Sequence, residues 1–476
     1  MCRPLYGRVA RLFRNPLRSL CHAALAASLL LGLAAAPALG GEPATPEWSQ
    51  AQGGSGHPGL LEEGPAPPYR MAWTFHATEG GLSGAIVTGG VAISVGTHAV
   101  YGIDLRTGKE IWRLVRNGGP LSVPAVGVSG RRQILVFVDE APVSGTSLVG
   151  VDLGTRRELW RTRLGAQSRS GVTIDGPRVF AGDENGNVVA VELQTGALRW
   201  KAKAQGEILT PPAVADGRVY VVAHDTSAGR SQLVAFDEQS GRRAWPAYSA
   251  PVAGSTVSGA AAVAGVVVVG FADRIVRELA ADGGNLRWEE LALSYFSPAS
   301  MPAVAGGDVY IADVAAGLYR LNAETGSRRW DYQFNDLVIR SSPVVSGSTV
   351  LLGLDDGRLV AVDVRSGDLV WQSEPSSGLL GAIALSHQVV VAVRGGEHPG
   401  LVAFVHDAEG RLVHVPSPTV VDAGALVGNF AIALIVVFGL LFVPFRVLAR
   451  RTGSSRPSVD EDESGHGEDE EEDDAG

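Results

Sequence analysis

Near the middle of the chain the sequence reads VVAVELQTGALRW, from Val188 to Trp200. A run of small and β-branched apolar residues is followed by a polar Gln-Thr-Gly turn and then by a tryptophan. Such a run predicts a short buried strand, and the glycine stands where a tight hairpin needs a positive φ. The stretch therefore predicts two strands joined by a hairpin.

The same pattern recurs along the chain. An eighth, degenerate copy at Leu401–Val413 lacks the tryptophan, and the tryptophans of the other seven follow one another every 40 to 48 residues. A fixed period of about 40 residues is typical of a solenoid or a propeller. The six other copies with tryptophan are Val100–Trp112, Leu148–Trp160, Leu233–Trp245, Val276–Trp288, Leu318–Trp330 and Leu359–Trp371.

The segments between the copies decide between these two architectures. Short apolar runs precede each copy, such as Pro211–Ala215 and Arg218–Val222, bounded by Gly, Asp or Pro and without a helical period. Each repeat therefore predicts four short strands, and such units repeated radially form propeller blades. We expect an all-β, eight-bladed propeller of four-stranded antiparallel blades at residues 71–416, or seven blades if the eighth copy does not pair. The tryptophans would fill the wedges between blades.

Both ends of the chain look like targeting or membrane segments. Residues 1–40 combine five arginines with an Ala- and Leu-rich stretch, which predicts a signal peptide, or an uncleaved anchor with the same topology. Ala423–Phe445 has 23 uncharged residues and predicts a transmembrane helix. Residues 446–476 are basic and then acidic, and we expect a disordered cytoplasmic tail. Together these features predict a single-pass protein of the cytoplasmic membrane, with residues 41–70 as a lead-in to an extracytoplasmic propeller.

The repeat resembles that of the quinoprotein-type propellers, usually written A-x-D-x-x-T-G-x-x-x-W. The resemblance spans about Trp73 to Val413, and Trp48-Ser49-Gln50 followed by Gly53–Gly59 resembles the segment that opens many such domains. It implies that Trp73-Thr74-Phe75 is a lone N-terminal strand that completes the last blade. The family includes dehydrogenases that use pyrroloquinoline quinone and calcium. It also includes binding propellers such as the lipoprotein subunit of the outer-membrane protein assembly machinery, to which this chain is closer.

The residues offer little for catalysis. The two cysteines, Cys2 and Cys21, lie in the predicted signal peptide, so the cysteine pair that the resemblance would place over a quinone is absent. The motif Asp183-x-Asn185-x-Asn187 begins like a calcium loop but lacks its remainder, and a plain hairpin is the favoured interpretation. The aspartates at the repeat position are expected to cap turns, and the histidines show no metal-binding spacing. These are Asp104, Asp152, Asp237 and Asp363, and His76, His98, His224, His387, His398, His406 and His414.

The remaining candidates are structural. No basic patch is present in a chain of net charge −10, so nucleic acid is not an expected partner. Trp48 lies outside the repeat and has no assigned place. The residues assigned to blade packing are Trp73, Trp112, Trp160, Trp200, Trp245, Trp288, Trp330 and Trp371, with Gly108, Gly196, Gly241, Gly326 and Gly367.

The sequence therefore predicts a non-catalytic scaffold without cofactor or metal, which binds an envelope protein or polymer through the propeller rim. Long connections at Asp139–Ser147, His224–Gln232 and Arg394–Gly400 are the candidate partner-facing loops, because function on repeat scaffolds tends to lie in such departures. The alternatives are a quinone-dependent dehydrogenase with a divergent site, using pyrroloquinoline quinone and calcium, and a receptor that signals through the acidic tail.

Overall fold

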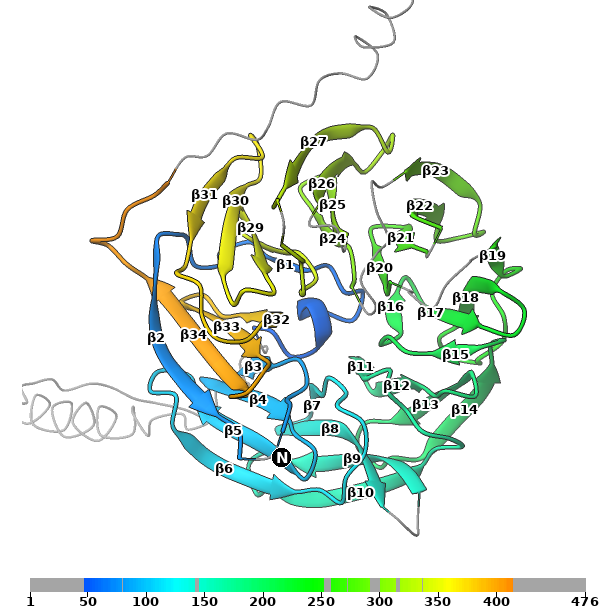
Figure 1. Cartoon of the computed structure of the whole chain (residues 1–476). Coiled ribbons are helices and arrows are strands. Elements are labelled where there is room, and N and C mark those ends of the chain that lie inside the picture. The colour runs from blue at the N-terminus through cyan, green and yellow to red at the C-terminus, as the bar shows by residue number, and fades with distance from the viewer. Residues whose placement is uncertain are drawn as a thin grey trace, which may run out of the picture. The chain divides into compact units, whose positions relative to one another are not determined.

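The computed structural model describes residues 47–413, apart from residues 79, 142–144, 252–257, 272, 292–299, 314–316 and 336. Eight antiparallel sheets form a ring, each with an inner strand near the axis and an outer strand at the rim (Figure 1). This confirms the all-β, eight-bladed propeller, and the seven-bladed alternative is wrong. Within the described ranges, no helix is long and apolar enough to cross a membrane. The predicted signal peptide (1–40), transmembrane helix (423–445) and tail (446–476) lie outside the described residues.

The first four blades follow the chain in order, and blade 4 has an additional short strand, since β15 and β16 both pair with β17. Blade 1 contains β3 (Ile86–Thr88), β4 (Val91–Val95), β5 (Ala99–Asp104) and β6 (Glu110–Val115). Blade 2 contains β7 (Ala125–Ser129), β8 (Arg132–Ala141), β9 (Gly145–Asp152) and β10 (Arg157–Arg163). Blade 3 contains β11 (Val172–Asp175), β12 (Arg178–Gly182), β13 (Asn187–Glu192) and β14 (Leu198–Lys203). Blade 4 contains β15 (Glu207–Ile208), β16 (Ala213–Ala215), β17 (Arg218–Asp225), β18 (Arg230–Asp237) and β19 (Tyr248–Pro251).

The last four blades repeat the arrangement. Blade 5 contains β20 (Ala260–Val263), β21 (Val266–Gly270), β22 (Ile275–Ala280) and β23 (Leu286–Leu291). Blade 6 contains β24 (Ala303–Ala305), β25 (Asp308–Ala312), β26 (Gly317–Asn322) and β27 (Arg328–Gln333). Blade 7 contains β28 (Val344–Ser346), β29 (Thr349–Gly353), β30 (Leu359–Asp363) and β31 (Leu369–Gln372). Blade 8 contains β32 (Leu380–Leu385), β33 (Val389–Arg394), β34 (Gly400–His406) and, from the other end of the propeller sequence, β2 (Tyr69–His76).

Burial along the strands follows from the packing of blade against blade. A third strand such as β13 is covered on both faces, so its central residues Val188–Val191 are all buried. An outer strand such as β14 has one face at the rim, and Trp200 is its one fully buried residue. The third strand therefore has a continuous apolar run because both of its faces are covered. The outer strand has a single buried tryptophan because one of its faces lies at the rim.

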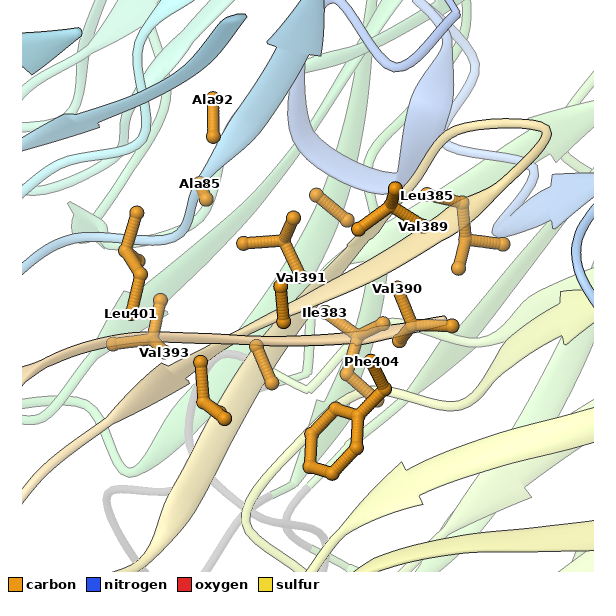
Figure 2. Packing of buried hydrophobic residues seen from close by; sticks show 14 of the residues in the cluster. Ala85, Ala92, Ile383, Leu385, Val389, Val390, Val391, Val393, Leu401 and Phe404 are labelled. Atoms are coloured by element: carbon orange, nitrogen blue, oxygen red, sulfur yellow. The ribbon is translucent and has the colours of Figure 1, made fainter. Parts of the chain in front are cut away.

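Strand β2 closes the ring. It pairs antiparallel with β34, and Trp73 lies opposite Ala403. This blade packs on blade 1 in one continuous apolar cluster, which includes Ala85 and Ala92 of blade 1 and Ile383 and Val391 of blade 8 (Figure 2). The last blade thus contains strands from both ends of the propeller sequence, as the resemblance implied.

The described part of the lead-in segment before β2, residues 47–68, passes through the middle of the ring, where η1 (Ala51–Gly53) lies (Figure 1). Strand β1 (Leu60–Leu61) pairs in parallel with β28. Trp48 exchanges two backbone hydrogen bonds with Val87 of blade 1. Along its length the segment bonds to the inner strands of blades 1 to 7, which the sequence did not predict. In blade 3 the partner is Ile174, which bonds to the Gln50 side chain. In blades 2 and 4 to 7 an inner-strand N–H donates to a lead-in carbonyl at 2.7–2.8 Å: Val126 to Ser49, Val214 to Ser55, Ala262 to Gly56, Val304 to Pro58 and Val345 to Gly59.

Candidate functional site

Most repeat tryptophans lie against a glycine of the next blade. The Trp200 indole Nε1 donates a hydrogen bond to Glu238 O at 2.8 Å, and its ring covers Gly241. Gly241 has φ +68°, and a Cβ built on it would lie 2.6 Å from the indole. A glycine is therefore required there twice, for its backbone conformation and for the close approach of the ring. The same seating joins Trp73 to Gly108, Trp160 to Gly196, Trp245 to Gly284, Trp288 to Gly326 and Trp330 to Gly367.

Two blades depart from this arrangement, and one glycine was missed. In blade 2 the turn carries Arg156 in place of glycine, also at a positive φ of 58°. Trp371 packs edge-on against Tyr69, with the ring centroids 5.0 Å apart. Gly284 is absent from the sequence-based assignment because its Asp-Gly-Gly turn departs from the Thr-Gly pattern, although the spacing to Trp288 could have revealed it. All eight repeat tryptophans are 5–9 % exposed, so none of them offers an open aromatic face.

The repeat aspartates cap the turn between the third and outer strands. In each case Oδ1 accepts the backbone N–H of the residue three positions later, at 2.8–2.9 Å. Hydrogen bonds from the hydroxyl and N–H of Thr107 hold the pKa of Asp104 below its ordinary value. The pKa values of Asp152 and Asp237 are lowered in the same way, by Thr155 and Ser240. These carboxylates are ionised hydrogen-bond acceptors and are poorly suited to proton transfer. The four caps join Asp104 to Thr107, Asp152 to Thr155, Asp237 to Ser240 and Asp363 to Ser366.

The loop that begins like a calcium site is closed by its own hydrogen bonds. Asp183 Oδ1 accepts the N–H groups of Asn185 and Asn187, and Oδ2 accepts the Asn187 amide at 2.7 Å. This is the geometry of a plain hairpin turn. Among the residues that the structure describes, no three His, Cys, Asp or Glu side chains gather in a way that could hold a metal ion. The absence of a cofactor remains a prediction.

The histidines are dispersed over the propeller. His76 and His398 form an edge-on pair with ring centroids 6.0 Å apart. His387 and His406 face the backbone carbonyls of Glu63 and Ala66 in the lead-in segment, whereas His224 lies 2.9 Å from the Ser231 hydroxyl. His98 lies in the turn between β4 and β5, and His414 falls outside the described residues. The structure thus brings together one pair of the sequence-predicted histidines.

A central cavity of about 240 Å³ lies on the axis of the ring, and the lead-in segment lines it with Trp48, Ala51 and Gln52. Trp48 is buried there, which gives it the place that the sequence could not assign. The other lining residues lie at the beginnings of the inner strands and in the loops that lead to them. Polar lining side chains include Ser122, Arg169, Ser300 and Arg340. None of these four residues was singled out from the sequence. A Ser or Thr does recur in seven blades at the position that Ser122 and Ser300 occupy, just before the inner strand.

Two long hairpins stand at the same end of the ring. In a four-stranded meander, the turn between the second and third strands lies on the same side as the loop that leads to the next blade. The hairpins β8–β9 and β17–β18 therefore project on the side of the cavity loops, and we call this side the hairpin face. Strand β8 has ten residues and β17 has eight, against five in β12 of blade 3. In blade 8 the connection runs from Arg394 to Gly400, which pair with each other.

Ion pairs and hydrogen bonds brace these hairpins. Asp139 of β8 accepts the backbone and side-chain N–H groups of Asn117 and the Arg161 guanidinium at 2.7–2.8 Å. Burial opposes the ionisation of Asp139, but the bonds from Arg161 and Asn117 hold its pKa below the ordinary value. In blade 4, Asp225 accepts the Ser227 hydroxyl and the Ala228 N–H, which closes the tip of β17–β18. The described residues of both hairpins are therefore braced by side-chain hydrogen bonds.

These features define a repeat β-propeller, and comparison with known proteins agrees. A family model described as outer membrane protein assembly factor BamB matches residues 144–295 and 291–378. The chain belongs to the PQQ-like repeat family of β-propellers. Outer membrane protein assembly factor BamB of Burkholderia pseudomallei is 28 % identical over 357 residues, which cover 68 % of this chain and 85 % of that protein. The protein of the same name from Salmonella typhimurium is 25 % identical over 342 residues, 67 % of this chain and 84 % of that protein.

Solved structures show the fold alone. BamB from Moraxella catarrhalis has a TM-score of 0.54 at 15 % identity and covers 71 % of this chain and 100 % of its own. Quinohemoprotein alcohol dehydrogenase ADHIIG from Pseudomonas putida has a TM-score of 0.61 at 12 % identity and covers 79 % and 82 %. An assembly factor and an enzyme therefore share this architecture, and the fold does not separate the two functional kinds.

The predicted location requires a correction. The sequence predicts a single-pass protein of the cytoplasmic membrane, but the relatives are named for outer membrane protein assembly. The placement in the cytoplasmic membrane is therefore wrong. It rested on apolar and arginine-rich segments at the two ends of the chain, and such segments report hydrophobicity and charge rather than which membrane of the envelope is involved.

Proposed function

We propose that this protein is a non-catalytic scaffold that acts in outer membrane protein assembly and binds a protein partner through the hairpin face. The braced hairpins β8–β9 and β17–β18 carry this proposal, because they extend beyond what packing between blades requires. Loops that a rigid scaffold positions in this way are common places for binding. The likeness to the BamB proteins over most of their length supports the assembly role.

The chemistry of the repeat agrees with a binding role. The repeat aspartates cap turns, and six repeat tryptophans donate their indole N–H to a backbone carbonyl of the next blade. These groups are occupied in holding the fold, so they leave no acid–base pair or stacking platform for a substrate. The likeness to quinohemoprotein dehydrogenases concerns the fold, and no observation on the described residues favours that activity.

Site-specific photo-crosslinking in cells tests the proposal. A benzophenone amino acid at Thr226, exposed at the tip of β17–β18, is expected to crosslink to one discrete envelope protein. The matched control is Glu324, which is also exposed but lies in the turn between the third and outer strands of blade 6, on the opposite face. Equal crosslinking from both positions, or none from Thr226, would contradict binding through the hairpin face.

A second measurement addresses the assembly role. Cells that lack the protein should contain less folded outer-membrane protein, measured by heat-modifiable migration in gels. An unchanged level of folded outer-membrane protein would contradict the role in assembly. Binding through the hairpin face is tested separately by the crosslinking.

A further inference from the structure

The central cavity, which we call the socket, is lined by the loops that lead to the inner strands on the hairpin face and by the lead-in segment. Its floor includes the Trp48 and Gln52 side chains, and Gln52 is tied across the axis by a hydrogen bond from Nε2 to Pro343 O at 3.1 Å. The lead-in segment that carries these two side chains is held in place by hydrogen bonds to the inner strands of seven blades. The socket volume of about 240 Å³ lies below the roughly 300–1,000 Å³ of pockets for drug-sized ligands. A single inserted side chain suits this volume.

The charged residues that line the socket are both arginines. Arg169 enters from the loop before blade 3 and Arg340 from the loop before blade 7, four blades apart in a ring of eight. No Asp or Glu is among the lining residues that the structure describes, in a chain whose net charge is −10. Arg169 pairs with Glu184 at 2.8 Å, whereas Arg340 is exposed and forms no ion pair among the described residues. Within the described part of the chain, the socket therefore offers one cation, Arg340, without a carboxylate partner.

A buried hydroxyl points to the same ligand chemistry. Ser122 lines the socket and is 2 % exposed, yet its Oγ has no hydrogen-bond partner in the described structure. At the same inner-strand position, Ser170 and Ser341 accept the backbone N–H of Gly182 and Gly353. Leaving a buried hydroxyl without a hydrogen-bond partner is unfavourable, so a ligand that accepts its hydrogen bond is favoured. A carboxylate can accept from the hydroxyl and the guanidinium together.

We propose that the central cavity receives one Asp or Glu side chain from a loop of the protein partner that docks on the hairpin face. The carboxylate is held by Arg340 and accepts a hydrogen bond from Ser122. Apolar Leu121 and Leu209 line the same socket, so the acidic residue is expected to stand between apolar neighbours on the partner loop. This inference rests on the proposed function, because it names the chemistry of the partner at the same face.

Calorimetry on the purified full chain tests the socket with defined probes. The peptide acetyl-Gly-Leu-Glu-Leu-Gly-amide is expected to bind at least tenfold more tightly than its Gln counterpart. Arg340→Gln should remove this discrimination, Arg340→Lys should retain part of it, and Ser122→Ala should weaken the Glu peptide more than the Gln peptide. The matched control is Arg365→Gln, an exposed arginine in the outer turn of blade 7 that is absent from the cavity lining. Unfolding midpoints of all variants establish that they fold.

Three outcomes overturn the inference. Equal binding of the two peptides excludes a preference for carboxylate, and discrimination that survives Arg340→Gln places the binding elsewhere. Succinate binding at least tenfold tighter than the Glu peptide identifies a small free carboxylate as the ligand. The Thr226 crosslink distinguishes a failure of this inference from a failure of the proposed function. If the crosslink persists while the Glu and Gln peptides bind equally, the binding of an acidic side chain in the socket is contradicted and the scaffold function is retained. If the crosslink is absent, the proposed function itself fails.

Discussion

Single tryptophans determine how firmly neighbouring blades are joined. Trp200 is 8 % exposed and covers Gly241 of the next blade, and Trp330 covers Gly367 in the same way. Replacing either tryptophan by Ala is expected to lower the free energy of unfolding by about 3–5 kcal/mol, the usual range for a buried tryptophan. Urea unfolding measures this change. The control is Leu198→Ala on the same strand as Trp200, because Leu198 is 56 % exposed. If a tryptophan variant lost no more unfolding free energy than this control, the packing of the tryptophans between blades would be contradicted.

Glu278 is a buried acid at the position opposite the repeat tryptophan, where five other blades have Ala or Gly and blade 6 has Arg320. It lies opposite Trp288, as Gly150 lies opposite Trp160 and Ala190 opposite Trp200. It is 0 % exposed, neither carboxylate oxygen has a hydrogen-bond partner in the described structure, and the Arg287 side chain at 3.3 Å is itself 42 % exposed. Burial raises the pKa of Glu278 from 4.5 to about 7, against the opposing effect of Arg287.

This shift predicts a pH-dependent stability. Between pH 4.5 and 7 the folded protein holds the Glu278 proton and the unfolded chain has lost it, so stability falls as the pH rises through this window. At about 1.4 kcal/mol per pKa unit the total loss is on the order of 3 kcal/mol. Glu278→Gln should therefore stabilise the protein at pH 8 and leave pH 4 nearly unchanged, as measured by urea midpoints. An equal effect at both pH values would show that ionisation is not involved.

Among the secondary-structure elements, the turn between the third and outer strands has two separate tasks, to reverse the chain and to seat a tryptophan. Gly217, in the turn between β16 and β17, and Gly241, in the turn after β18, have nearly the same φ, +71° and +68°. A Cβ on Gly217 would meet nothing within 4 Å, whereas one on Gly241 would meet the Trp200 ring. Gly217→Ala measures only the cost of placing a residue with a Cβ at a positive φ, which is about 1–3 kcal/mol of the free energy of unfolding. Gly241→Ala should cost a further 1–3 kcal/mol or so, because the ring must move. Equal unfolding midpoints for the two variants would show that the contact between Gly241 and the Trp200 ring adds nothing to the cost of the substitution.

At the scale of the whole molecule, the lead-in segment holds the ring together at its axis. A Cβ on Gly56 would lie 2.1 Å from Ala262 O, while Gly56 O accepts the Ala262 N–H at 2.7 Å. Gly56→Ala should push the segment away from blade 5 and free that amide. Hydrogen exchange is expected to speed up at least tenfold at Ala262 and, through Pro58, at Val304. The amide of Val221, within the β17–β18 ladder, is the internal control. Unchanged exchange at Ala262 would mean that the segment does not stabilise the axis.

The repeat made much of the architecture predictable. Strand length, hairpin turns and capping aspartates depend on residues within four positions of each other, so Asp104 with Thr107 and the glycine at 108 could be assigned from their spacing. The blade count followed from the number of repeats. Closure by Trp73 followed from the resemblance, since a degenerate last copy needs a tryptophan-bearing strand from the start of the propeller. The plain hairpin at Asp183 was also favoured from the sequence.

The candidate socket could not be predicted, because its residues come together through ring closure. Gln52 bonds to Pro343 and Gln50 to Ile174, and such separations leave no pattern in the sequence. Trp48, Ser122 and Arg340 face one cavity because the lead-in segment follows the axis. The sequence by itself determined a ring of eight blades, since each blade is specified by short-range hydrogen bonding and apolar patterning. The tertiary structure alone decided what fills its centre, since that depends on contacts among all the blades at once.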